Sequence, residues 1–279
     1  PVLRIASGPT NSLRGAAFLS GVKDAIVIDV GGTTTDLGVL KAGFPRESGA
    51  AVEIGGVRTN FRMPDLISIG LGGGSIVRTE NQEITVGPDS VGFRIREEAL
   101  SFGGSTMTAT DVVIAGDGID IEGAKTGTKI DGETQKAVTA KIKSMLEEVV
   151  DKGKTVLGDT TVVAVGGGSI LVPSVLAGAS EVIKPDHFEV ANAIGAAISQ
   201  VSGQVDGVFD VAGKGRDNVV AEVKAMAIRN AEEAGAQPGT IEIVELDEIP
   251  LAYLPSNAVR FRAKAVGALN TENLGGGKE

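Results

Sequence analysis

The sequence contains no cysteine and a single histidine, His187. Without cysteine there can be no disulfide, no thiolate nucleophile and no Cys-ligated zinc or iron–sulfur cluster. With one histidine, multi-His metal sites are excluded, and a Ser-His-Asp triad would have to use His187. Aromatic residues make up only 3% of the chain, which disfavours a platform of rings for stacking nucleic-acid bases. Any chemistry must therefore depend on carboxylates, hydroxyls, cations and backbone groups.

Long apolar runs and an excess of positive charge are also missing. No uncharged apolar stretch is long enough to span a bilayer, and no basic segment followed by an apolar one marks a signal peptide. The net charge of −10 disfavours nucleic acid or an anionic membrane as a partner. We therefore expect a cytoplasmic protein with neither partner. The chain begins at Pro1 without a methionine, which suggests a processed product, an engineered piece or a fragment.

Glycine, in contrast, is abundant, with 40 residues in a chain of 279. This is about twice the average usage. Three clusters stand out: Gly31-Gly32, Gly72–Ser75 and Gly166–Ser169. None completes a G-x-G-x-x-G pattern or a Walker A loop, so Rossmann and P-loop sites are disfavoured. The Gly166–Ser169 cluster follows an apolar strand, where a structural turn and a ligand-binding loop are both typical.

Residues 26–40, IVIDVGGTTTDLGVL, predict a β-hairpin. Two apolar runs flank a turn of two glycines and three threonines, and Asp29 and Asp36 stand at its two ends. Such a turn offers backbone and hydroxyl donors with little side-chain bulk, which suits an anion. The two carboxylates could hold a hard cation beside that anion. The pattern fits the terminal phosphates of a Mg-nucleotide, while a plain glycine-tipped hairpin with capping aspartates remains the alternative.

The rest of the chain predicts an α/β protein with a smaller α+β domain at its C-terminus. Strands are expected at 57–62, 66–69, 161–165 and 181–183, a second hairpin at 76–86, and helices at 12–19, 134–150, around 173–177 and from Asp186 to about Val201. Alternation of helix and strand favours parallel packing. A strand at 205–211, a helix at 218–234 and strands at 241–246 and 258–266 form the second domain. We expect domains at 1–203, with a less regular insertion at about 91–133, and at 204–270, followed by a disordered tail at 271–279.

Three further residues or segments have simpler interpretations. Asp111, preceded by Thr108 and Thr110, is expected to be the N-cap of a helix. His187 is expected to be partly exposed in the first turn of a helix, with a catalytic role as the less favoured alternative. Ser7–Pro9 is either a plain turn or a loop at the edge of a cleft.

An ordered series of segments resembles the hydantoinase A/5-oxoprolinase family. The series runs SGP at 7–9, KDAIVIDVGGTTTDLGVL at 23–40, SIGLGGGSI at 68–76, VGPDS at 86–90, TATD at 108–111 and VGGGS at 165–169. Each piece alone is weak, but the order is specific, and the resemblance covers about 4–203. It departs from the family at 91–104, in the residues after Ser169, and in lacking a second D-x-G-G-T-x-T-D hairpin.

The family is similar to the actin/Hsp70/sugar-kinase superfamily, in which two ribonuclease-H-like lobes close on ATP. The resemblance implies ATP and Mg²⁺ as cofactors, with Asp29 near the metal and Asp29 and Asp36 as catalytic candidates. It implies nucleotide contacts from Gly31, Gly32, Thr33, Thr34, Thr35, Gly166, Gly167, Gly168 and Ser169. Gly72, Gly73, Gly74 and Ser75 form a family signature and are candidates for lining the cleft.

The resemblance implies ATP-dependent hydrolysis of a cyclic amide, with phosphorylation of a lactam or imide carbonyl before ring opening. Because a first phosphate hairpin is missing, a further N-terminal lobe or a partner subunit is expected, and the chain alone should be inactive. A homo-oligomer is left open. Two alternatives share the fold: a non-catalytic actin-like nucleotide-binding module and a small-molecule kinase.

Overall fold

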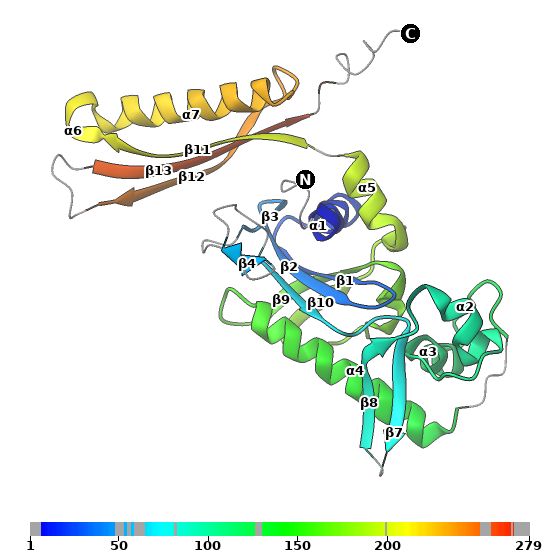
Figure 1. The fold of residues 1–279 in the computed structure, drawn as a ribbon. Coiled ribbons are helices and arrows are strands. Elements are labelled where there is room, and N and C mark those ends of the chain that lie inside the picture. The colour runs from blue at the N-terminus through cyan, green and yellow to red at the C-terminus, as the bar shows by residue number, and fades with distance from the viewer. Residues whose placement is uncertain are drawn as a thin grey trace, which may run out of the picture. The chain divides into compact units, whose positions relative to one another are not determined.

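The computed structural model of the chain contains two compact units, Pro1–Ala197 and Ile198–Glu279 (Figure 1). The structure describes residues 7–47, 53–54, 57–58, 65–80, 83–125, 130–198, 200–251, 258–268 and 270. Most of the predicted strand at 57–62 and the predicted disordered tail at 271–279 lie outside the described residues.

The first unit is built on one mixed sheet. Its strands are β1 (Ala25–Val30), β2 (Thr35–Lys41), β3 (Phe44–Pro45), β6 (Leu66–Ile69), β9 (Thr160–Val165) and β10 (Ala179–Ile183). Their order is β10-β9-β1-β2-β3, and β6 also pairs with β2. The strands β1, β9 and β10 run parallel, while β2 is antiparallel to β1. This order and direction define the ribonuclease-H-like arrangement, so the predicted mixed α/β fold is confirmed.

Helices cover both faces of this sheet (Figure 1). The helices α1 (Ser7–Ser20) and α4 (Gly132–Gly153) pack on opposite faces, while α5 (Ala191–Ala197) packs on α1 and α3 (Ala109–Asp117) packs on α4. Because side chains alternate along a strand, neighbouring residues of β1 enter different cores. Val27 packs with Leu13 of α1, whereas Ile28 lies in the larger core with Leu146 of α4. Burial on both faces explains why β1 and β9 are almost entirely apolar.

Smaller elements connect these layers. They are the paired strands β4 (Glu53–Ile54) and β5 (Val57–Arg58), the hairpin of β7 (Ser75–Glu80) and β8 (Glu83–Ser90), the helix α2 (Ile95–Glu98), and the 3-10 turns η2 (Gly92–Arg94), η3 (Leu100–Phe102), η4 (Gly167–Leu171) and η5 (Phe188–Val190). The predicted helix at 134–150 corresponds to α4, and the predicted hairpin at 76–86 corresponds to β7 and β8.

The second unit is a three-stranded antiparallel sheet with a helix packed on it. It contains β11 (Gln200–Asp210), α6 (Val211–Lys214), α7 (Arg216–Glu233), β12 (Glu242–Pro250) and β13 (Ala258–Ala268), with strand order β11-β13-β12. The buried stripe of α7, with Val219, Val223 and Ala227 four residues apart, packs against Phe261. The predicted small α+β fold is confirmed.

Three sequence predictions of local structure were wrong. The helix expected around 173–177 is absent; the turn η4 ends at Leu171, because Pro173 holds Val172 in an extended conformation. The helix expected from Asp186 to Val201 is only α5, because His187 adopts a left-handed conformation (φ 63°) and β11 already begins at Gln200. Finally, Ser7–Pro9 forms the first turn of α1 rather than a loop.

Candidate functional site

The predicted hairpin is formed by β1 and β2. Asp29 and Asp36 lie directly opposite each other in the strand register, so their side chains point to the same face of the sheet. The Gly31 N–H donates to the Thr34 carbonyl at 2.9 Å and closes the turn. Residues 32–34 at the tip are exposed. Thr35 is buried instead, and its hydroxyl donates to the Leu71 carbonyl at 2.6 Å, which leaves Thr33 and Thr34 as the exposed hydroxyl donors.

The Gly72–Ser75 segment lies directly against the hairpin tip. The Gly73 and Gly74 N–H groups donate to the carbonyls of Gly31 and Gly32, at 3.0 and 2.7 Å. A Cβ atom at Gly72 would lie 2.5 Å from the Thr33 nitrogen, so the two backbones meet with no room for a side chain. The segment is buried and supports the hairpin from inside. The expectation that Gly72–Ser75 also lines a cleft stays a prediction.

The TATD segment at 108–111 contacts Gly73 through hydrogen bonds from Thr110 to the Gly73 carbonyl. Asp111 is completely buried and accepts hydrogen bonds from the backbone N–H groups of Leu100, Ser101 and Thr108, at 3.2, 2.7 and 2.8 Å. With the Thr108 hydroxyl it forms a capping box at the start of α3. The N-cap of α3 is Thr108, and Asp111 lies at the third helical position. The prediction that Asp111 itself is the N-cap was wrong, although its side chain takes part in the capping box.

The Gly166–Ser169 segment reaches the same site through β9. Since β1 and β9 are parallel neighbours, with Asp29 beside Val165, their carboxyl ends meet at one edge of the sheet. A Cβ atom at Gly166 would lie 2.3 Å from Asp29 Oδ1, and one at Gly168 would lie 2.6 Å from the Gly31 carbonyl oxygen. Gly166 also has a φ of +87°. The Ser169 hydroxyl donates to the Val165 carbonyl, which fastens the segment to β9.

Asp29 is the electrostatically unusual residue of this site. Burial raises its pKa, a hydrogen bond from the Ser12 side chain opposes that rise, and repulsion from Asp36 adds to it. Asp36 itself accepts a hydrogen bond from the Ser68 hydroxyl. Two carboxylates that face each other at partial burial are costly unless a cation or a donor is present.

The residues present fit a Mg-nucleotide. Side chains placed at Gly32 or Gly167 would meet nothing within 4 Å, so these two backbone positions are open to a ligand. Among the described residues there is no group of three or more acidic, histidine or cysteine side chains that could hold a metal. Magnesium bound to a nucleotide does not need one, because it uses one or two carboxylates together with phosphate and water. Asp29 and Asp36 would supply these carboxylates.

Two residues of the site were missed by the sequence analysis. Ser12 is buried on α1 and hydrogen-bonds to Asp29. Asn192 on α5 donates to the Ser12 hydroxyl oxygen at 3.0 Å. Nothing in the sequence links residues 12, 29 and 192, because only the folded sheet and its two helices bring them together. His187 is exposed, as expected.

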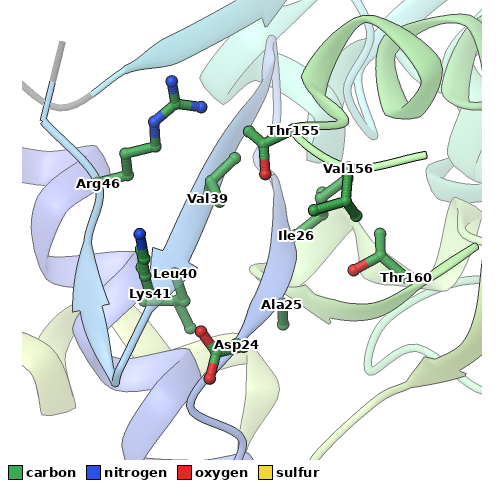
Figure 2. Close-up of a pocket in the computed structure, with 10 residues that line it drawn as sticks. All are labelled: Asp24, Ala25, Ile26, Val39, Leu40, Lys41, Arg46, Thr155, Val156 and Thr160. Atoms are coloured by element: carbon green, nitrogen blue, oxygen red, sulfur yellow. The ribbon is translucent and has the colours of Figure 1, made fainter. Parts of the chain in front are cut away.

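A pocket of about 430 Å³ lies at the other end of β1, away from the hairpin tip (Figure 2). Figure 2 shows Lys41 and Arg46 on one side of it and Thr155 and Thr160 on the other, with Ile26 and Val39 between them. None of the predicted site residues lines this pocket.

In the described part of the chain, every helix is too short or too polar to span a membrane.

The fold and site define an α/β protein with a ribonuclease-H-like sheet whose glycine-rich segments converge on a carboxylate pair. Residues 1–129 match the family described as Hydantoinase/oxoprolinase, in agreement with the resemblance carried by the sequence motifs. The matched residues contain the hairpin, the Gly72–Ser75 segment and the TATD segment, whereas Gly166–Ser169 lies outside them.

Known proteins similar to the chain include the gamma subunit of acetophenone carboxylase from Aromatoleum aromaticum (strain DSM 19018 / LMG 30748 / EbN1). It is 32% identical over 109 residues, which cover 37% of this chain and 15% of that subunit. A nucleotide-free structure of acetone carboxylase, from work on ATP-dependent acetone carboxylation, matches 95% of this chain and 49% of its own, at a TM-score of 0.61 and 17% identity. The ATP-dependent caprolactamase from Pseudomonas jessenii matches 95% of this chain and 50% of its own, at a TM-score of 0.62 and 16% identity.

At these identities the two solved structures support the fold alone. The chain spans about half the length of each and a smaller share of the curated relative. Both structures belong to proteins described as ATP-dependent or as acting in an ATP-dependent reaction.

Proposed function

We propose that this chain forms one lobe of an ATP-dependent enzyme that opens a cyclic amide, a lactam or an imide. The observation that carries the proposal is the convergence of the hairpin tip with the Gly166–Ser169 segment beside Asp29 and Asp36. The family of residues 1–129 and the similarity to an ATP-dependent caprolactamase support this choice of substrate class.

The roles of the residues follow from their exposure. The backbone and hydroxyl groups of Thr33 and Thr34 would donate to phosphate oxygens at the exposed tip. Asp29 would hold Mg²⁺ directly or through water, with Asp36 across the hairpin as the second carboxylate. The bare backbone at Gly167 would let the ribose or base lie close to the chain.

An amide carbonyl is a poor electrophile, which is why this reaction would need ATP. When bound, ATP would supply a phosphoryl group to the amide oxygen, which would make the ring carbon electrophilic enough for water to add. The ring C–N bond would then break with the nitrogen leaving as the amine, and the phosphate would be released by hydrolysis. The chain's own contribution would be to position the phosphates and to stabilise charge with fixed donors, a mode of catalysis that requires neither cysteine nor a histidine cluster.

A second lobe or a partner subunit would complete this site. The chain spans about half of each solved structure, and the curated relative is named as a subunit. One hairpin can contact only one side of a triphosphate, so we expect the chain alone to be inactive.

A second candidate is ATP-dependent carboxylation of a small ketone. It is favoured by the 32% identity to a subunit named for acetophenone carboxylase. Both candidates use ATP to activate a carbonyl compound, and they differ in the second reactant, which is water in one and bicarbonate in the other.

The test is ADP release by the complete protein with its partners, measured with panels of lactams, cyclic imides and ketones, the ketones with and without bicarbonate. We expect release stimulated by a cyclic amide and matched by ring-opened product. Stimulation only by a ketone with bicarbonate would favour the carboxylase. A phosphorylated product that accumulates would indicate a kinase, and nucleotide binding without turnover would indicate a non-catalytic module.

A further inference from the structure

Asn192 connects α5 to two polar groups of α1. Its side-chain nitrogen donates to the Gly8 carbonyl at 2.8 Å and to the Ser12 hydroxyl oxygen at 3.0 Å. A carbonyl can only accept, so the Asn192 atom that faces Gly8 must be the amide nitrogen. The amide therefore presents hydrogens, and not its oxygen, to Ser12.

In this arrangement the Ser12 hydroxyl accepts with its oxygen and can donate with its single hydrogen. A serine inside a helix often donates back to the carbonyl four residues earlier, which here is Gly8. Asn192 already donates to that carbonyl and also to the Ser12 oxygen. An ionised carboxylate can only accept, so the hydrogen bond between Ser12 and Asp29 uses the single hydrogen of the Ser12 hydroxyl.

The packing of α1 on α5 keeps Asn192 at this distance. A Cβ atom at Gly195 would lie 1.8 Å from the Asn11 carbonyl oxygen, and one at Gly15 would lie 1.9 Å from the Ala191 carbonyl oxygen. The two helices therefore touch backbone to backbone on both sides of Asn192. Its amide is placed by rigid elements rather than by a loop.

We propose that Asn192 and Ser12 are positioning residues that orient the Asp29 carboxylate toward the bound metal and phosphates. The inference rests on the proposed function, because it assigns the support of that same site. In this arrangement Asn192 donates to Ser12, Ser12 donates to one Asp29 oxygen, and the other oxygen is left to face the ligand. Outer hydrogen bonds of this kind typically change metal affinity by about 10- to 100-fold.

The test compares Ser12→Ala and Asn192→Asp in the complete protein. The second variant keeps the shape of the side chain but replaces the donor with a carboxylate, which can only accept, so the Ser12 hydroxyl would turn away from Asp29. Asn192 is exposed, so this variant is expected to fold even where Ser12→Ala, at a buried position, does not. Ala193→Asp, at the exposed neighbouring position, is the matched control because it adds the same charge without contacting Ser12.

The readout is the affinity for a non-hydrolysable ATP analogue, measured by calorimetry with and without Mg²⁺. We expect about a 10- to 100-fold loss with Mg²⁺ in both variants, less than about a twofold change without it, and no loss in Ala193→Asp. Equal losses in Asn192→Asp and Ala193→Asp, or no loss in either positioning variant, would overturn the inference.

Crystal structures of the nucleotide-free wild type and Asn192→Asp separate this inference from the proposed function. We expect the Asp29 carboxylate to rotate away from Ser12 in the variant. If wild type binds no Mg-nucleotide but this rotation is seen, the proposed function fails and the positioning contact stands. An Asp29 carboxylate that is unmoved in the variant overturns the positioning role whatever the ligand.

Discussion

Thr110 donates twice to the carbonyl of Gly73, through its backbone N–H at 3.0 Å and through its hydroxyl at 2.8 Å. Gly73 in turn donates to Gly31 in the hairpin tip. The start of α3 is thereby connected to the proposed phosphate-binding turn through a single residue. This contact joins the TATD segment to the Gly72–Ser75 segment, although the two are far apart in sequence.

Thr110→Val should loosen this connection without changing the volume of the side chain. The hydroxyl bond to a buried carbonyl is lost, so we expect a loss of about 1 kcal/mol in the free energy of unfolding, measured with urea. Thr85→Val, at an exposed position of β8, is the control and should change stability by less than about 0.5 kcal/mol. Equal effects of the two substitutions would contradict a special role for the Thr110–Gly73 contact.

Gly72→Ala and Gly32→Ala should separate support of the hairpin from contact with the ligand. The alanine at position 72 would press on the Thr33 backbone, so we expect a loss of about 2 kcal/mol in stability. The alanine at position 32 meets open space, so the fold should be retained while Mg-nucleotide affinity falls. Both properties can be measured by thermal unfolding and calorimetry. Unchanged affinity in Gly32→Ala would argue against a phosphate at the tip.

The second glycine segment offers a similar pair, Gly168→Ala and Gly167→Ala. A Cβ atom at position 168 would crowd the Gly31 carbonyl and Val30, whereas one at position 167 meets nothing within 4 Å. We expect a lower melting temperature only for Gly168→Ala, and weaker nucleotide binding with a normal melting temperature for Gly167→Ala. If Gly167→Ala binds nucleotide as wild type does, the ligand does not approach that backbone position.

Asp29→Asn should stabilise the nucleotide-free protein at neutral pH while abolishing turnover. Burial raises the pKa of Asp29 above its ordinary value of 3.8, so the folded state binds a proton more tightly than the unfolded chain. The favourable contribution of this carboxyl group is therefore complete below about pH 3.8 and is lost as the pH rises through the raised pKa. We expect the variant to be more stable than wild type by about 1 kcal/mol at pH 7, and this gain to vanish near pH 4.

Thermal unfolding of nucleotide-free wild type and Asp29→Asn at the two pH values measures this difference. A variant that is less stable than wild type at pH 7 would mean that the ionised carboxylate stabilises the fold, contrary to the burial argument.

Asp111→Asn should be strongly destabilising although it keeps the shape of the side chain. Three backbone N–H groups and one hydroxyl donate to this carboxylate, and an amide nitrogen would face some of these donors. We expect a loss of about 2–3 kcal/mol in the free energy of unfolding. Asp120→Asn, at an exposed position, is the control and should be nearly neutral. A small effect at Asp111 would show that its hydrogen bonds contribute little.

The sequence was sufficient for the elements whose signal is local. The apolar stripe of α4, the alternation in β13 and the turn residues of the hairpin follow from periodicities within one element, and they led to the right fold class. Predictions failed where one residue overrode a longer pattern, as Pro173 ended the turn η4 and the left-handed His187 delayed the helix α5.

The residue types of the candidate site could also be predicted from the sequence, because glycines, threonines and aspartates are suited to binding phosphate and Mg²⁺. Their arrangement depended on the tertiary structure. Only the parallel pairing of β1 with β9 brings Gly166 to Asp29, and only the packing of α1 against α5 connects Asn192 through Ser12 to that carboxylate. Contacts between residues more than a hundred positions apart leave no periodic trace in a single sequence, so they were decided by the packing of the sheet and its helices.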